Sequence, residues 1–167
     1  YKRQALFIGR EIYPFVQAHF HSPSEHTLDG RTYDAEIHFV HVRANGMAAL
    51  LTVFMAIGEP NPGLQTILDN APKTPGVPTH RPTMISFDPK SLLPQHALRA
   101  EGSVASHYLS YQGSLSEPPC SEGVAWYVLE EPTTLSKQQL AQLEQFFKYN
   151  RRALQPVNGR ETFSNRR

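Results

Sequence analysis

Two short stretches decide the fold and the site of this chain: QAHFHSPSEHT at residues 17–27 and AEIHFVH at residues 35–41. Side chains alternate between the two faces of a β-strand, so His19 and His21 project from one face, about 6.7 Å apart along the backbone. If the second stretch pairs antiparallel with the first, His38 joins them from the neighbouring strand. The pattern therefore predicts three imidazoles that converge on one point.

Three histidine nitrogens on rigid strands favour a zinc site. Neutral imidazole is a good ligand for Zn²⁺, whereas calcium and magnesium prefer oxygen ligands. Three protein ligands leave the fourth tetrahedral position open, which is the arrangement of catalytic zinc. We therefore expect Zn²⁺ to be held by His19, His21 and His38.

The other five histidines carry weaker signals. A single histidine on a strand is more often hydrogen-bonded and structural than a metal ligand. We expect His26 and His41 to support the ligands or to be structural, and no motif surrounds His80, His96 and His107.

The whole sequence predicts a mostly β fold with minor α content, as one domain over residues 1–167. Runs rich in β-branched, aromatic and other apolar residues, separated by turn signals, predict antiparallel strands; these runs are residues 5–8, 13–22, 33–43, 47–56, 106–111 and 124–129. Frequent prolines and glycines leave room for only a short helix, at about residues 64–70. A second helix is predicted to begin at Ser136, which can form a capping box with Gln139.

Composition excludes several kinds of partner. Apolar residues make up 40% and charged residues 19% of the chain, as in ordinary globular proteins. The net charge of +1 offers no general attraction to nucleic acid. The longest mostly apolar stretch, residues 47–57, is too short to span a bilayer. We expect neither a nucleic-acid nor a membrane partner, and the sequence leaves the oligomeric state open.

A cupin is an alternative metal-binding fold. Its H-x-H-x3-E pattern is matched by His19, His21 and Glu25, which would make Glu25 a ligand. The cupin motif also requires glycines at set distances, but Tyr13 occupies the upstream position and Gly30 comes two residues early. The cupin is therefore the weaker match.

The two histidine stretches resemble the signature of the α-class carbonic anhydrases at nearly every defining position. Further matches to that family follow downstream: GSLSEPP at residues 113–119 in the active-site loop, Trp126, and Asn150, Arg152 and QP at 155–156 in the closing segment. The similarity extends over residues 5–160, and its details look like those of the bacterial members. It implies the largely antiparallel central sheet of that family, lacking its N-terminal part.

The resemblance also implies the reaction: zinc-dependent, reversible hydration of carbon dioxide to bicarbonate and a proton by zinc-bound hydroxide. His19, His21 and His38 would be the zinc ligands. Three groups would orient them: Gln17, Glu36 and the backbone carbonyl of Asn150.

Two further residues would take part in catalysis by resemblance. The Ser116 hydroxyl would donate a hydrogen bond to Glu25 and accept one from the hydroxide. An apolar pocket would hold the uncharged substrate; its lining residues would be Val40, Leu50, Leu115, Val124 and Trp126, with the Glu117 carboxylate near the open zinc position. Sulfonamides and anions are the expected inhibitors.

Some features depart from the family pattern. The chain is expected to begin partway into the domain, which would leave the usual proton-shuttle histidine upstream of Tyr1. In bacterial-type relatives the cysteine that matches Cys120 pairs with one near the N-terminus, so the resemblance implies a periplasmic or secreted location. A non-catalytic binding module on the same fold remains an alternative function.

Overall fold

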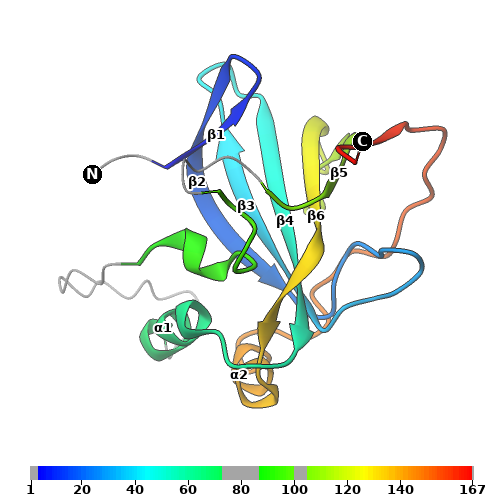
Figure 1. Cartoon of the computed structure of the whole chain (residues 1–167). Helices are drawn as coiled ribbons and strands as arrows, with labels where there is room; N and C mark the ends of the chain where they lie inside the picture. The colour runs from blue at the N-terminus through cyan, green and yellow to red at the C-terminus, as the bar shows by residue number, and fades with distance from the viewer. Residues whose placement is uncertain (1–3, 73–86, 100–104, 167) are drawn as a thin grey trace.

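Among residues 4–72, 87–99 and 105–166, which the computed structural model describes, seven strands form one mixed sheet (Figure 1). The strands are β1 (Ala5–Ile8), β2 (Glu11–His21), β3 (Ala35–Val42), β4 (Ala48–Ile57), β5 (Tyr108–Ser114), β6 (Glu122–Leu135) and β7 (Thr162–Ser164). Their order across the sheet is β1-β2-β3-β4-β6-β5-β7. The helical elements are α1 (Pro62–Asn70), the 3-10 helix η1 (Pro89–Leu92) and α2 (Lys137–Leu143).

The prediction of a largely antiparallel sheet is confirmed, but one pairing differs. β4 and β6 run parallel, whereas the other pairings between the described strands are antiparallel. Parallel neighbours cannot be joined by a tight hairpin and need a longer connection. The strand that follows β4 in the sequence, β5, lies one position away from β4 in the sheet. β6 then fills the position between them.

Several strand and helix positions follow the sequence patterns closely. β1 has its predicted bounds, and the capping box between Ser136 and Gln139 is present at the start of α2. β6 is longer than predicted because it continues through Pro132, where the pairing with β4 shifts register and no ladder hydrogen bond is required of the proline. β7 and η1 were not predicted, and His80 lies outside the described residues.

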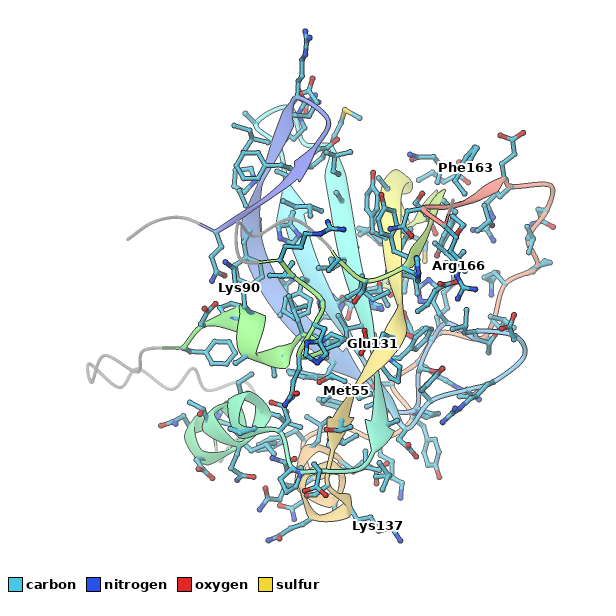
Figure 2. All side chains as sticks on the ribbon, in the orientation of Figure 1. Met55, Lys90, Glu131, Lys137, Phe163 and Arg166 are labelled. Atoms are coloured by element: carbon cyan, nitrogen blue, oxygen red, sulfur yellow. The ribbon has the colours of Figure 1, made fainter. Side chains whose placement is uncertain are left out.

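The two faces of the sheet have different roles. α1 follows β4 and α2 follows β6, so both helices start from the same end of the sheet (Figure 1). They and η1 cover one face, where apolar side chains of β3 and β4 are fully buried, including Met55, labelled in Figure 2. The opposite face carries His19, His21 and His38. Among the described residues, no helix is long and apolar enough to cross a membrane.

A buried glutamine joins the two helices beneath the sheet. Gln139 of α2 is 2% exposed. Its Oε1 accepts hydrogen bonds from the backbone N–H of Asn61 at 2.9 Å and of Ser136 at 3.1 Å, and its Nε2 donates to the Asn61 carbonyl at 2.8 Å. The Asn61 side chain in turn caps α1 by accepting from the Leu64 N–H. This one amide therefore links the starts of α1 and α2 to each other.

Replacing this amide should destabilise the fold strongly. In Gln139→Leu the buried Asn61 N–H loses its partner, whereas the Asn61 carbonyl still accepts from the Gln65 N–H at 3.0 Å. An unpaired buried donor costs about 1–3 kcal/mol, so we expect the free energy of unfolding to fall by about that amount. Urea denaturation measures the change. Gln138→Leu, at the exposed neighbouring position, is the control and should stay within about 0.5 kcal/mol of the unchanged chain. A similar loss in both variants would contradict the assignment.

Candidate metal centre

The three histidines of the signature stretches meet on one face of the sheet. His19 of β2 pairs directly with His38 of β3, and His21 lies two residues further along β2. The ring centroid of His19 lies 5.2 Å from that of His21 and 5.1 Å from that of His38. The His21 and His38 centroids are 4.7 Å apart. One ligand nitrogen from each ring lies within 4.8 Å of the other two. The three imidazoles therefore face a common point.

The free nitrogens of this cluster fit a metal ion. His21 Nε2 is buried and has no hydrogen-bond partner among the described residues, and His38 Nδ1 lies 3.3 Å from His19 Nε2. Buried polar atoms in folded proteins are almost always paired, because an unpaired one costs free energy. A cation at the common point would satisfy all three nitrogens, and Zn²⁺ suits such a nitrogen donor set.

The surroundings keep these imidazoles in the form that binds metal. Burial, reinforced by the neighbouring His38 and His21, lowers the pKa of His19 from 6.5 to about 4. Burial also lowers the pKa of His38, against the raising effect of Glu36. Both rings are therefore neutral at neutral pH, with a lone pair free for a metal.

The fully buried carboxylate of Glu36 binds the His38 ring nitrogen that does not face the other two ligands. Glu36 Oε1 accepts from His38 Nε2 at 2.5 Å and from His26 Nδ1 at 2.7 Å, while Oε2 accepts from the His26 backbone N–H at 3.0 Å. Burial alone would raise the pKa of Glu36, but the charge of His26 and the hydrogen bonds from both histidines lower it below its ordinary value. The carboxylate is therefore ionised, and it turns His38 Nδ1 toward the other two ligands.

The chain segment around Asn150 holds His21. The backbone carbonyl of Asn150 lies 3.2 Å from His21 Nδ1 and accepts its hydrogen. The Asn150 side chain fixes this carbonyl in place, since its Oδ1 accepts from the Ser22 N–H at 3.0 Å and its Nδ2 donates to the Phe20 carbonyl at 2.9 Å. His21 Nε2 is left to face the cluster.

Glu25 lies next to the cluster but is held by another residue. Its Oε1 accepts from the backbone N–H of Arg152 at 2.6 Å and lies 3.5 Å from His21 Nδ1. Its Oε2 is buried without a partner among the described residues. Ser116 is partly buried and forms no hydrogen bond with Glu25 in the described part of the chain. Arg152 links Glu25 to the loop that carries Ser116, since its side chain donates to the Ser114 hydroxyl and to the Leu115 carbonyl.

Gln17 lies on the same face of β2 as His19 but is exposed. Across the described residues, its side chain makes no hydrogen bond with His19. A register shift between Phe15 and Gln17 interrupts the pairing of β2 with β3 at this point. Gln17 is therefore the one expected orienting group that the structure does not bring to its histidine.

The residues expected to line the substrate pocket form one apolar cluster on the histidine face. Leu50, Val124 and Trp126 are buried at its centre, and Val40 and Leu115 pack against them. The Trp126 ring lies edge-on to His38, with centroids 4.9 Å apart, and its Nε1 donates to the Ser114 carbonyl at 3.0 Å. Glu117 is exposed in the loop that follows. The three ligands therefore have an apolar wall beside them.

Sequence reasoning did not assign two residues that contact this centre. Tyr111 of β5 lies 2.7 Å, through its hydroxyl, from His26 Nε2, and the backbone of Arg152 reaches Glu25. Both contacts join positions 85 or more residues apart, and nothing in the local pattern of either residue signals them. His41, His96 and His107 belong to neither of the two metal-competent groups found among the described residues.

Comparison with known proteins places this geometry in a family. The family model described as eukaryotic-type carbonic anhydrase matches residues 3–166. A carbonic anhydrase from Nostoc sp. is 39% identical over 156 residues, covering 93% of this chain and 55% of the relative. The α-carbonic anhydrase of Thermovibrio ammonificans, solved with sulfanilamide, superposes with a TM-score of 0.82 at 38% identity, covering 93% of this chain and 64% of that one.

A second solved structure agrees. A carbonic anhydrase from Chlamydomonas reinhardtii, solved with acetazolamide, has a TM-score of 0.82 at 34% identity and covers 98% of this chain and 71% of that one. The chain spans 55–59% of the length of the three curated bacterial relatives compared. The match extends over nearly the whole sequence, including both histidine strands, and the chain belongs to the eukaryotic-type, or α-class, carbonic anhydrase family.

Proposed function

We propose that this chain hydrates carbon dioxide reversibly to bicarbonate and a proton at a zinc ion held by His19, His21 and His38. The observation that carries the proposal is the convergence of three imidazoles, one with a buried and unpaired nitrogen, beside an apolar wall. When bound, zinc acts as a Lewis acid that lowers the pKa of a water ligand to about 7, a value known from carbonic anhydrases themselves. The cupin alternative does not apply, because the family is a different one.

The residues around the ligands have distinct parts in this proposal. Glu36 and the Asn150 carbonyl hold the rings of His38 and His21 in the metal-binding tautomer. Leu50, Val124 and Trp126 offer an uncharged substrate an apolar surface and exclude water from it. In the reacting state the Ser116 hydroxyl would donate to Glu25 Oε2, which has no partner among the described residues, and would present its own lone pair to the reacting water.

We also propose a class of inhibitors and a location for the protein. Sulfonamides are proposed inhibitors, supported by the sulfanilamide and acetazolamide complexes of the two relatives. An exported, oxidising location is proposed from the resemblance of Cys120 to a disulfide-forming position; among the described residues its thiol is free. Protein isolated without reductant would show whether Cys120 forms a disulfide.

Removal of one ligand should abolish both metal binding and hydration. In His38→Ala we expect zinc content to fall from one ion per chain to background, because two imidazoles do not complete the donor set. Metal analysis and stopped-flow measurement of carbon dioxide hydration test this, with exposed His96→Ala as the control. Zinc bound without hydration in the unchanged chain would contradict the enzyme and favour a non-catalytic binding module.

The exposed Glu117 should weaken inhibition by anions. A carboxylate near an open cationic site repels anions by about 0.5–1 kcal/mol when solvated, so Glu117→Thr should lower anion inhibition constants by about twofold to fivefold. Inhibition by thiocyanate at low ionic strength measures the effect. Glu122→Thr, at an exposed position after the same loop, is the control. Equal inhibition constants before and after the Glu117 change would remove the idea.

Acid should destabilise the metal-free protein through the ligand histidines. The pKa of His19 is about 4 in the folded chain and 6.5 ordinarily. Between these values the unfolded chain binds a proton that the folded chain excludes, so the free energy of unfolding falls as the pH drops through this range. Thermal melting of chelator-treated protein at stepped pH tests this. His19→Gln should flatten the slope, whereas exposed His107→Gln should not; equal slopes would disprove the assignment.

A further inference from the structure

A cavity lies on the face of the sheet opposite the three histidines. Its volume is about 750 Å³, and small-molecule sites in proteins occupy about 300–1,000 Å³. A row of cross-strand partners forms its floor. Phe39 of β3 pairs with Leu51 of β4, and Leu51 pairs with Tyr127 of β6. Tyr127 pairs in turn with Ser110 of β5, whose small side chain leaves space above the sheet.

Two further segments enclose the cavity. They are β1 and the stretch from η1 to Leu98, which lie toward the same end of the sheet (Figure 1). A hydrogen bond joins them, from Gln4 Nε2 to Asp88 Oδ1 at 2.7 Å. Phe7 of β1 also lines the cavity, and it is 69% exposed. The cavity therefore has the bounds of a small-molecule site, with apolar surface still open to solvent at its rim.

The charges around the cavity favour an anion. Of the described residues that line it, none carries a carboxylate, and Lys90 of η1 supplies a positive charge. Lys90, labelled in Figure 2, is exposed and forms no ion pair with the described residues. Burial lowers the pKa of His41 and raises the pKa of Tyr127, so both side chains stay uncharged near neutral pH.

The acid next to this lysine in the sequence does not cancel its charge at the cavity. Asp88 is not among the lining residues. Its Oδ1 already accepts hydrogen bonds from Gln4 Nε2 at 2.7 Å and from the Lys90 backbone N–H at 3.0 Å. The lining is therefore apolar with one cation at its edge, which complements a ligand that has an apolar body and one negative charge.

We propose that this cavity binds a fatty acid: its aliphatic chain lies over Leu51 and against Phe7, and its carboxylate pairs with Lys90. The chain removes apolar surface of the floor and of the Phe7 ring from water, which is the main favourable contribution to binding. The cavity shares no lining residue with the metal centre, so this site does not depend on the proposed function.

Calorimetric titration with dodecanoate, below the concentration at which it forms micelles, tests the proposal. We expect saturable binding at a single site with a negative heat-capacity change, because apolar surface is buried. Each buried methylene contributes about fourfold in affinity, so decanoate, which has two fewer, should bind about tenfold more weakly. Saturating acetazolamide should leave dodecanoate binding unchanged, because that inhibitor is expected on the other face of the sheet.

Two variants, each with a matched control, locate the site. Lys90→Gln should weaken dodecanoate binding by about twofold to fivefold, the contribution of a solvated ion pair, whereas Lys137→Gln on exposed α2 should not. Leu51→Trp fills the cavity and should weaken binding by about tenfold or more. Leu51→Met conserves volume and should bind as the unchanged chain does.

A direct measurement keeps the proposal testable if Leu51→Trp fails to fold. In the unchanged chain, nuclear Overhauser effects should connect the dodecanoate chain with the methyl groups of Leu51 and Leu93. Absence of saturable binding, displacement of dodecanoate by acetazolamide, or full affinity in both Lys90→Gln and Leu51→Trp would overturn the proposal. A dimer that dodecanoate dissociates in sedimentation would also overturn it, since a second copy of the chain would then be the occupant.

Discussion

The burial of one ionised carboxylate constrains the rest of the site. Glu36 is 0% exposed near the start of β3, and an isolated charge there would be prohibitively costly. Three hydrogen bonds compensate it: one from the His38 ring, one from the His26 ring and one from the His26 backbone. Because all three donors must be in place together, the segment after β2 that carries His26 is fixed relative to β3. The metal-binding direction of His38 is a consequence of this constraint.

The strict alternation of side chains along the strands separates stability from chemistry. On β3, Ile37 and Phe39 pack against the helices, while Glu36 and His38 face the site. Neighbouring residues on one strand thus serve different purposes. The helices stabilise the face that carries no chemistry, so the ligands project from a backbone whose position is already determined by the apolar core.

Local sequence patterns predicted most of the strands and helices, but fewer of the contacts that form the site. Period-two alternation predicts that His19 and His21 share a face, and the turn between the two stretches predicts that His38 lies beside them. The parallel pairing of β4 with β6 has no local signal, because it depends on where a long connection returns. The same holds for the contacts of Tyr111 with His26 and of Arg152 with Glu25, which join distant positions.

The Asn150 carbonyl was expected only through family resemblance, since any residue carries a carbonyl. Among the described residues Ser116 makes no hydrogen bond with Glu25, and Gln17 is exposed. Both observations depend on loop and strand-end geometry, which no residue pattern encodes.

The contact between the Asn150 carbonyl and His21 joins positions 129 residues apart. Closing so long a loop has an entropic cost that must be met before the contact contributes, and proteins dominated by such contacts fold slowly. The two histidines of β2 leave the ribosome well before the segment that orients one of them. Zinc that meets the nascent chain therefore finds its ligands before their supports, and the finished coordination geometry is acquired only after the Asn150 segment has emerged and docked.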